Sequence, residues 1–462
     1  MFRNAVPIME KSDLLLILDG MKDKLDASCQ QLWDHPEVGG TEDFGPAYLK
    51  AMLAEEGFTV TVNDKLPTAF IAEWGTGSPV LAFLGEYDAL PGLSQKVSAT
   101  KEEIVSGGPG HGCGHNLLGS GTAACVIALK KVMEQDGLTG TLRFYGCPEE
   151  ELLSGKVKMA YHHMFDGCDI AFSWHPSDGN TVYDKAYLAS ASYRFYFKGL
   201  SSHAGLAPQN GRSALDAVEI MNVAVQYLRE HVIDGTRIHY TTDSCGYATN
   251  IVHPQANSWY YVRAPFITDV KETAARVIKC AKGAATATET EVEAKLVCGC
   301  CEMLTNHAFA DLTHKNMLLV PPTEYTQEEL AFAAKLQETL NPALLSRQKA
   351  LYGTDAPLHS GAAPRDFWKS LPVYASSDAG DVSYIMPMNL INTTCWPIGV
   401  APHTWQAAAS TGSSIGKKGA LWSAKATALT AYDILTMPEE LEKIKNEFRQ
   451  RNDGSYKPMY EG

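Results

Sequence analysis

The sequence has no run of apolar residues long enough to cross a membrane. The longest apolar run near the N-terminus is Leu14–Leu18, whereas a spanning helix needs roughly 18–20 apolar residues. Lys11, Asp13 and Asp19 flank this run, which is typical of an amphipathic helix and not of the apolar core of a signal peptide. We therefore expect no export signal and no membrane association.

Positive charge is also scarce. Lys and Arg together number 39 and Asp and Glu number 53, so the formal net charge is −14. Nucleic acids and anionic membranes attract proteins through an excess of basic residues, and this balance argues against binding to either through bulk charge. It does not exclude a local basic pocket that binds an acidic substrate.

A disulfide framework is not indicated either. The chain has 11 cysteines, which is an odd number, and they are scattered along the sequence. Secreted disulfide scaffolds are usually short chains with an even number of cysteines. We therefore expect a reducing, cytoplasmic compartment, in which most of the cysteines are small buried apolar side chains.

Length and composition are those of an ordinary globular protein with several domains. A chain of 462 residues predicts two to four domains, and 45% apolar with 20% charged residues is typical of globular proteins. Strand-like and helix-like segments alternate up to about residue 188, which predicts an α/β layered domain. The pattern changes there and changes back after about residue 304. We therefore predict a catalytic domain in two parts, 1–187 and 305–462, and an inserted lid or dimerisation domain at 188–304.

The insert shows the order β-α-β-β-α-β, which is typical of a ferredoxin-like domain. Its two middle strands are predicted at Ala248–Val252 and Trp259–Arg263. Its second helix is predicted at Val270–Ala281, with Asp269 and Glu272 as a capping box at its start.

Candidate metal ligands follow several of the predicted strands. They comprise a Cys-x-His pair in a glycine-rich loop, a run of glutamates and two further histidines. These are Cys113, His115, Glu149-Glu150-Glu151, His175 and His403. Thiolate, imidazole and carboxylate ligands together suit Zn²⁺, Mn²⁺, Fe²⁺ or Co²⁺. Such an ion can generate a nucleophile from water near neutral pH, and a neighbouring glutamate can take the proton of that water.

Each of these features also has a plainer interpretation. A lone Cys-x-His is more often structural, consecutive glutamates commonly begin a solvated helix, and a histidine before proline is usually a loop residue. The glycine-rich loop suggests a phosphate cradle, but it lacks the Gly-Lys-Ser/Thr ending of a P-loop and the spacing of a dinucleotide fingerprint. The cluster Cys298-Gly299-Cys300-Cys301 has no matching Cys or His pair nearby, so we interpret it as structural. The metal hypothesis depends on all the features occurring together, each after a predicted strand.

Six short motifs carry a family resemblance. They read GEYDALPG at 85–92, GHGCGHN at 110–116, PEEE at 148–151, WHP at 174–176, SSHAG at 201–205 and PHTW at 402–405. Together they resemble the amidohydrolase branch of the aminoacylase/carboxypeptidase G metallopeptidase superfamily, over nearly the whole chain. The resemblance implies a zinc-peptidase-like three-layer α/β catalytic domain, interrupted by a ferredoxin-like α+β lid that dimerises.

The resemblance also implies a two-metal site that binds Mn²⁺ or Zn²⁺. Its ligands would be Cys113, His115, Glu151, His175 and His403. Glu150 would be the general base that activates the bridging water, and Asp88 would orient His115. Family members usually have Ala before a pair of glutamates, where this sequence has Glu149, so an assignment shifted by one residue is an alternative. His111 resembles a motif neighbour and not a ligand.

The lid is expected to contribute to the active site as well. By resemblance, His203 would reach the partner's active site and stabilise the tetrahedral oxyanion there. Asn250 and Arg263, which are 263 − 250 = 13 residues apart, resemble the pair that holds the free carboxylate of the substrate, to which an Arg can donate two parallel hydrogen bonds. The alternatives are a surface-turn histidine and a surface salt bridge.

The expected activity is hydrolysis of the amide bond of an N-acyl amino acid. The motifs are nearest to those of enzymes acting on p-aminobenzoyl-glutamate, a folate breakdown product; indole-acetyl-aspartate and β-alanyl dipeptides are alternatives. We expect a homodimer through the lid; the alternative is a heteromer that includes a related A-type subunit. Two rival hypotheses are a covalent mechanism with Cys113 as nucleophile and a non-catalytic subunit on the same fold. The presence of every ligand type and of Glu150 argues against the second rival.

Overall fold

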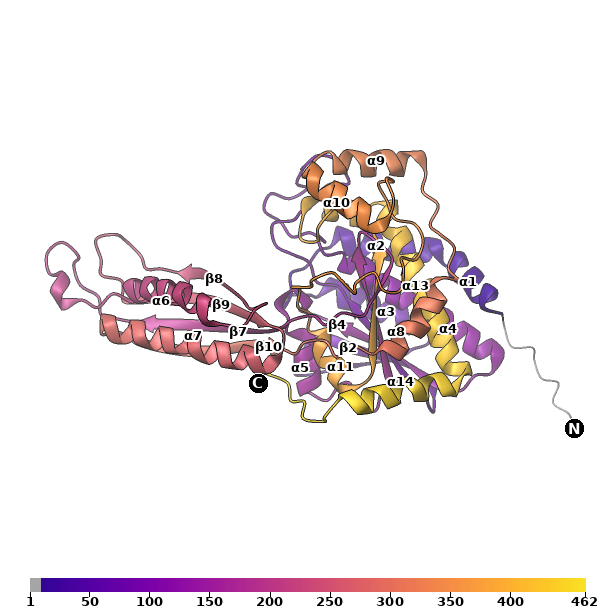
Figure 1. Cartoon of the computed structure of the whole chain (residues 1–462), viewed down its shortest axis with the longest axis horizontal. Coiled ribbons are helices and arrows are strands. Elements are labelled where there is room, and N and C mark those ends of the chain that lie inside the picture. Colours follow the sequence, from indigo (N-terminus) through magenta and orange to yellow (C-terminus); the bar gives the residue numbers. More distant parts are fainter. Residues whose placement is uncertain (1–9) are drawn as a thin grey trace, which may run out of the picture. The chain divides into compact units, whose positions relative to one another are not determined.

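The computed structural model describes residues 10–462, and these form two compact units (Figure 1). The first unit comprises the chain up to Lys185, Leu304–Pro372 and Val382–Tyr456. The second comprises Ala186–Met303, Val373–Asp381 and Lys457–Gly462. The inserted unit therefore includes two short segments from beyond residue 304, which the sequence pattern assigned to the second part of the catalytic domain. Local hydrophobic periodicity does not reveal such late returns of the chain.

A seven-stranded mixed sheet forms the centre of the first unit, in the order β1-β2-β4-β3-β5-β11-β6. The strands are β1 Thr59–Asn63, β2 Leu66–Thr76, β3 Val80–Glu86, β4 Gly140–Cys147, β5 Ile170–Ser177, β6 Thr181–Tyr183 and β11 Met388–Thr394. The four neighbours β4, β3, β5 and β11 run parallel to one another. At the edges, β2 pairs antiparallel with β4, β1 pairs antiparallel with β2, and β6 pairs antiparallel with β11. β11 is buried at every position, as expected for a parallel strand with both faces covered.

Two long helices, α4 (His115–Asp136) and α13 (Ser414–Thr436), pack against each other and against this sheet (Figure 1). α4 is rich in small residues, which let it approach the strands closely. A Cβ atom on Gly119 would lie 2.6 Å from the backbone oxygen of Glu86 at the end of β3. This close packing holds the first turn of α4, including His115, beside the carboxyl end of β3.

Further helices complete the first unit, and α11 crosses into the second. They are α1 Lys11–Gly20, α2 Lys22–Asp34, α3 Phe44–Glu55, α5 Gly155–Tyr161, α8 His307–Met317, α9 Gln327–Gln337, α10 Pro342–Tyr352, α11 Ala379–Ile385, α12 Trp405–Thr411 and α14 Pro438–Arg451. Among residues 10–462, none of the helices combines the length and the hydropathy that a membrane span requires.

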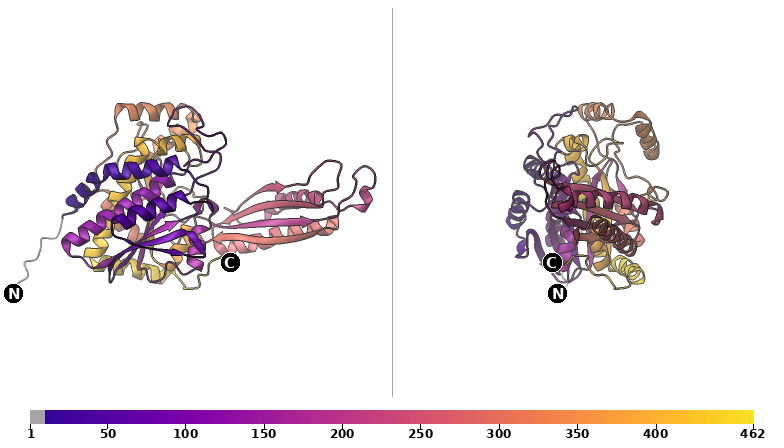
Figure 2. Two further views of the ribbon diagram at one scale, coloured as in Figure 1. Left: turned by 180° about the vertical axis from the view of Figure 1, so that it is seen from behind. Right: turned by 90° about the vertical axis from the view of Figure 1, so that its left-hand side faces the viewer.

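The second unit has the predicted ferredoxin-like order. Its elements are β7 Ala189–Lys198, α6 Ala214–Leu228, β8 Arg237–Ser244, β9 Gln255–Ala264, α7 Ile267–Thr288 and β10 Glu291–Cys300. The four strands form an antiparallel sheet in the order β10-β7-β9-β8. α6 and α7 lie side by side along this sheet (Figure 2) and share an apolar core with it. The mixed α/β sheet and the α+β insert together confirm the predicted fold class.

Two local predictions in the insert were wrong. The strand expected at Ala248–Val252 is a loop, and the observed edge strand is β8, Arg237–Ser244. Only Ile238 of β8 is buried, so this edge strand lacks the apolar alternation by which a strand is found in a sequence. The capping box at Asp269 and Glu272 is also absent, because α7 begins at Ile267 with Phe266 at the N-cap and no side-chain cap.

Candidate metal centre and active site

The candidate ligands meet at the carboxyl ends of the parallel strands of the first unit. Asp88 follows β3, the run Glu149-Glu150-Glu151 follows β4, His175 lies near the end of β5, and His403 lies in the loop after β11. Because β4, β3, β5 and β11 are parallel neighbours, their carboxyl ends lie at one edge of the sheet, where ligands of open α/β sheets bind.

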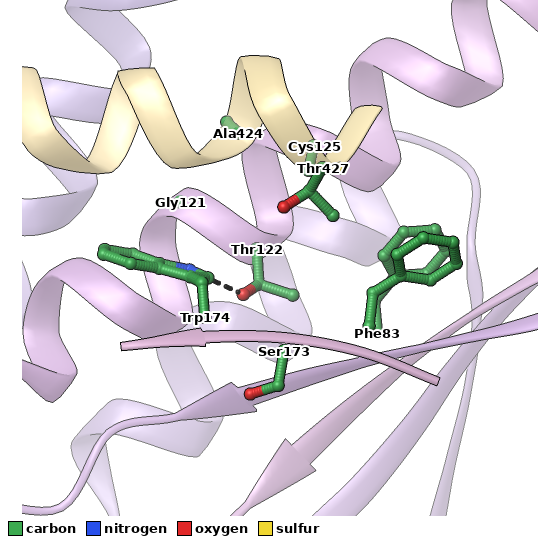
Figure 3. A pocket seen from close by; sticks show the side chains of 9 residues that line it. Phe83, Gly121, Thr122, Cys125, Ser173, Trp174, Ala424 and Thr427 are labelled. Carbon is green, nitrogen blue, oxygen red and sulfur yellow. Dashed lines mark hydrogen bonds between the residues drawn. The ribbon is translucent and has the colours of Figure 1, made fainter. Parts of the chain in front are cut away.

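β5 is anchored next to His175 by a buried indole. Trp174 is 2% exposed, and its Nε1 donates to the backbone oxygen of Leu118 at 3.3 Å and to Thr122 Oγ1 at 3.2 Å, both on α4. Figure 3 shows the hydrogen bond from Trp174 to Thr122 at the wall of a small internal cavity of about 10 Å³. The cavity is an interior packing feature, and the anchored indole fixes the backbone from which His175 projects.

The structure brings the five predicted ligands together in two overlapping groups. In each group the potential ligand atoms all lie within 4.8 Å of one another. One group contains Cys113, His115 and His175, and the other contains Cys113, Glu151 and His403. The Cys113 thiol is common to both groups, and its Sγ lies 3.3 Å from His175 Nε2. A shared thiol between two ligand groups is an arrangement that suits two adjacent metal ions.

Hydrogen bonds set the tautomers of two of the candidate ligands, the buried His115 and the half-buried His175. Asp88 Oδ1 lies 2.8 Å from His115 Nδ1, and the carbonyl oxygen of Pro176 lies 2.7 Å from His175 Nδ1. Both oxygens accept, so each Nδ1 donates, and each Nε2 faces the other candidate ligands. Acceptors behind a metal-binding imidazole commonly hold it in this way. Asp88 Oδ2 also accepts from the backbone N–H of Glu151 at 2.9 Å, so Asp88 positions two candidate ligands.

The three consecutive glutamates have three different environments. Glu149 has a positive φ of 56°, and its carboxylate accepts from Ser154 and Lys158, away from the histidines. Glu150 Oε2 lies 3.9 Å from His115 Nε2, and Glu151 Oε2 lies 3.2 Å from His403 Nε2. The geometry therefore favours the assignment by distance from Pro148 over the alternative shifted by one residue.

Two residues of this region were missed by sequence reasoning. Lys156 of α5 is fully buried, and its Nζ lies 2.6 Å from Glu86 Oε1; Glu86 Oε2 lies 3.3 Å from His115 Nε2. Glu86, His115 and Glu150 form a third group of potential ligand atoms within 4.8 Å. A lysine is almost never fully buried without a partner, but sequence alone does not show that Lys156 is buried, so its pairing with Glu86 became visible only in the structure.

Burial is the main cause of the pKa shifts at the centre. Burial, reinforced by the Glu151 carboxylate, raises the pKa of the Cys113 thiol well above its usual range, whereas a metal ion would make the thiolate its ligand form. Burial together with His115 lowers the pKa of His175, which favours the neutral imidazole that binds metals. Burial lowers the pKa of His111 to about 3, and its Nε2 lies 3.0 Å from the backbone oxygen of Leu32, outside all three ligand groups.

The donor set fits divalent metal ions. His115 Nε2, Glu151 Oε1 and Glu86 Oε2 are buried and have no hydrogen-bond partner within the described chain. Leaving such atoms unsatisfied costs on the order of 1–3 kcal/mol each, and cations bound within the overlapping ligand groups would reduce this cost. By contrast, Cys298, Cys300 and Cys301 are buried and belong to no ligand group in residues 10–462.

In the second unit, His203 and Asn250 lie at the same end of the sheet. The backbone N–H of Ala204 donates to Asn250 O, and Val252 N–H donates to Ser202 O. His203 is exposed, and its Nδ1 accepts from the backbone N–H groups of Gly205 and Leu206 at 3.2 and 3.1 Å. Nε2 therefore carries the proton and is available as a donor.

Arg263 lies far from His203 and Asn250 of the same chain. It lies 263 − 255 = 8 residues from the start of β9, so at about 3.3 Å per residue the strand alone separates it from the other end by roughly 26 Å. At the other end of β9, Gly199 N–H donates to Pro254 O. The pairing continues past this point to the bond between Ala204 N–H and Asn250 O, so Asn250 lies beyond the end of the strand. A single carboxylate cannot contact Asn250 and Arg263 of the same chain, which the 13-residue spacing did not reveal.

The chain is similar to known proteins along nearly its whole length. Residues 189–289 match the peptidase dimerisation domain. The chain is 40% identical to the B component of p-aminobenzoyl-glutamate hydrolase from Escherichia coli, over 92% of this chain and 91% of the relative. It is 26% identical to Xaa-Arg dipeptidase of Mus musculus over 94% of this chain and 90% of the relative.

Solved structures share the fold. A dinuclear metal-binding peptidase of the M20 family from Bacillus subtilis matches with a TM-score of 0.56 at 16% identity, over 90% of this chain and 99% of that one. An aminobenzoyl-glutamate utilization protein from Klebsiella pneumoniae matches with a TM-score of 0.57 at 15% identity, over 87% and 96%.

Fold and site together define a metal-dependent amidohydrolase. The chain belongs to the amidohydrolase branch of the M20 metallopeptidase family, among relatives of the B component of p-aminobenzoyl-glutamate hydrolase.

Proposed function

We propose that the chain hydrolyses p-aminobenzoyl-glutamate to p-aminobenzoate and glutamate, as a step in folate catabolism. The observation that carries this proposal is the meeting of Cys113, His115, Glu151, His175 and His403 in two overlapping ligand groups beside Glu150. The choice of substrate is supported by the 40% identity to a relative that is named for it. Indole-acetyl-aspartate and dipeptides are the alternative substrates, since relatives at 26–28% identity are named for an indole-acetyl-aspartate and for dipeptides.

The five ligands would hold two divalent ions, Mn²⁺ or Zn²⁺. When bound, such ions lower the pKa of water and polarise the substrate carbonyl. In the chain itself, Asp88 keeps the proton of His115 on Nδ1 and holds the Glu151 backbone. The ligand atoms are therefore oriented before an ion enters, which reduces the cost of binding.

Glu150 would move the proton. Its carboxylate is buried, lies on the same turn as Glu151 and groups with Glu86 and His115. In the proposed step it takes a proton from the attacking water and delivers it to the leaving amide nitrogen, as a general base and then a general acid. The protonated Nε2 of His203 would donate a hydrogen bond to the oxyanion.

We propose that the first unit is the catalytic domain and that the second unit is a lid through which the chain forms a dimer. His203 and Asn250 at one end of β9, and Arg263 at the other, would then serve different active sites. Each complete site would use Arg263 of one chain and His203 with Asn250 of a second copy. A heteromer with an A-type partner is the alternative, because the A component of the Escherichia coli hydrolase is 27% identical over 41% of this chain. All 11 cysteines lie within the described residues and none of them forms a disulfide, which supports a reducing cytoplasmic location.

The proposal is tested by measuring glutamate release from p-aminobenzoyl-glutamate by the purified chain. We expect release with Mn²⁺ or Zn²⁺, loss with a chelator and recovery when metal is added back. Glu150→Gln should reduce kcat by at least about 100-fold, since general acid–base catalysis contributes on the order of 10²–10⁴-fold, while the metal content measured by mass spectrometry stays unchanged.

Three outcomes would contradict the proposal. Release that ignores the chelator but stops on thiol alkylation would favour Cys113 as a covalent nucleophile. Unchanged kcat in Glu150→Gln would remove the proposed base. No release of glutamate from metal-loaded protein would exclude p-aminobenzoyl-glutamate as the substrate of the chain by itself. It would favour another acyl group or the need for a partner chain.

A further inference from the structure

One face of the four-stranded sheet in the second unit is left open by the helices. α6 and α7 share a core with the even-numbered residues of β9, such as Tyr260 and Val262. Burial alternates strictly along β9, with Tyr261 and Arg263 half-buried on the opposite face. The open face of the sheet therefore carries Tyr261 and Arg263.

Basic residues face one another across two strands at one end of this open face. Arg237 of β8 pairs in register with Arg263 of β9, and His239 pairs with Tyr261. We call Arg237, His239 and Arg263 the basic cluster. Directly opposed side chains lie about 5 Å apart, and like charges in such a pair destabilise a sheet. A repulsive pair of this kind in a protein with a net charge of −14 calls for a compensating anion.

The described chain supplies no such anion. Within residues 10–462, neither Arg237 nor Arg263 forms an ion pair with a carboxylate, whereas Arg194 on the same face is paired with Asp243. The Nε of Arg263 is buried and has no hydrogen-bond partner in this part of the chain. The basic cluster is therefore left with unused donors, unlike its neighbour on the same sheet face.

Arg237 is oriented without being neutralised. Its Nη1 donates to its neighbour's carbonyl, Thr236 O, at 2.9 Å, and its guanidinium stacks over the ring of Tyr374 at 4.6 Å. Tyr374 belongs to Val373–Asp381, one of the late segments that fold with this unit. Burial lowers the pKa of His239, and the guanidinium groups of Arg263, Arg229 and Arg237 lower it further.

We propose that Arg237, His239 and Arg263 form a subsite for the second carboxylate of an acidic leaving amino acid. Arg263 takes the α-carboxylate, and Arg237 with His239 takes the side-chain carboxylate of glutamate or aspartate. Two carboxylates joined by a short carbon chain match two guanidinium groups on directly opposed strand positions. The inference rests on the proposed amide hydrolysis and adds what selects the leaving group.

The test compares p-aminobenzoyl-glutamate with p-aminobenzoyl-glutamine, which differ only in the second carboxylate. The metal-loaded wild type should prefer the glutamate substrate in kcat/KM by at least about tenfold, because hydrogen bonds to charged groups are the strong ones. Arg237→Gln should remove most of this preference, mainly through a higher KM for the glutamate substrate. Arg194→Gln is the matched control: it removes one charge from the same face, and the preference should persist.

A stability measurement separates binding from a structural role. Because Arg237→Gln relieves the repulsion with Arg263, its Tm should stay equal to or exceed that of the wild type. Equal kcat/KM for both substrates in the wild type, or a parallel loss for both in Arg237→Gln together with a lower Tm, would overturn the subsite.

Binding of non-hydrolysable probes distinguishes failure of the subsite from failure of the proposed function. Titration calorimetry with glutarate and with butyrate needs no turnover. The subsite predicts tighter binding of glutarate to the full chain, by about tenfold, and loss of this difference in Arg237→Gln. If the amides are not cleaved but glutarate selectivity depends on Arg237, the proposed function fails and the subsite stands. If glutarate and butyrate bind alike, the subsite fails whatever the amides do.

Discussion

At the residue scale, the candidate centre depends on hydrogen bonds and ion pairs that position its side chains. Asp88 and the Pro176 carbonyl fix the two imidazoles, Glu149 is occupied by Ser154 and Lys158, and Lys156 holds Glu86. Buried charged groups persist only when they are paired. The site therefore consists of candidate ligands and of a second set of residues that keeps them in place.

Lys156 and Glu86 are predicted to be a structural unit within the site. Lys156→Met should lower the free energy of unfolding of the first unit by about 3–5 kcal/mol, because it strands a buried carboxylate. The double variant Lys156→Met/Glu86→Gln should recover part of this loss, since the uncompensated charge is gone. Denaturant unfolding followed by circular dichroism measures both variants.

The exposed pair Lys443–Glu440 provides the control, with a side-chain exposure of 60% at the lysine. Lys443→Met should change stability by less than about 1 kcal/mol. Equal effects of Lys156→Met and Lys443→Met would show that the buried pair has no special role.

At the element scale, a helix start that is held by a carboxylate adds a local, pH-sensitive contribution to stability. α9 begins with a reciprocal capping box in which Thr326 and Glu329 bond to each other's backbone N–H groups. Glu329 also accepts from Ser414 at 2.6 Å and lies 2.6 Å from Lys418 Nζ, both on α13. One carboxylate thus fixes both the start of α9 and its docking on α13.

We predict that Glu329→Gln destabilises the protein at pH 7 and much less in acid. Burial opposes ionisation, but the hydrogen bonds from Lys418 and Ser414 outweigh it, so the pKa of Glu329 is lowered on folding. A lowered pKa gives stability that is present above the unfolded value of about 4.3 and is lost as the pH falls through the folded value.

Since Gln preserves the capping box, the difference in Tm between the wild type and Glu329→Gln isolates the charge, and it should shrink from pH 7 towards pH 4. Glu338→Gln, at the exposed C-terminal end of the same helix, should leave Tm nearly unchanged at every pH. A difference that is constant with pH would contradict the assignment to an ionised Glu329.

At the scale of the whole molecule, the candidate functional residues are divided between two units. The first unit gathers the candidate metal ligands, and the second carries His203 and Asn250 at one end of its sheet and the basic cluster at the other. Roughly 26 Å of strand lies between these ends. In the proposed dimer, a second copy of the chain would supply the residues of the other end to each site.

Complementation in trans tests this arrangement. His203→Ala and Glu150→Gln should each be nearly inactive as separate proteins, while coexpression of the two should restore about a quarter of wild-type activity, since half of randomly assembled dimers have one intact site of two. Sedimentation should show a dimer for each variant. Dimers that remain inactive on coexpression would exclude His203 from acting across the dimer.

Some elements and residues of this protein could be predicted from the sequence and others could not. Apolar patterns predict a helix at 117–134 and buried strands at 79–84 and 170–174, and the structure has these elements at 115–136, 80–86 and 170–177. The five candidate ligands came from the family resemblance of the motifs and stay a prediction. β8 was missed, because Ile238 alone is buried in it. Lys156 and the basic cluster were missed because their meaning lies in partners that are distant in sequence or on a neighbouring strand.

By itself, the sequence determined the fold class, the insert and the order of its elements, and the residue types of a metal site. These follow from hydrophobic patterns and short motifs, which can be recognised in the sequence without knowledge of tertiary contacts. Only the tertiary structure decided which glutamate faces His115, that Lys156 is buried against Glu86, that Val373–Asp381 joins the second unit, and that Asn250 and Arg263 lie at opposite ends of β9. The reason is that burial, pairing across strands and late returns of the chain depend on contacts between distant segments, which no local pattern encodes.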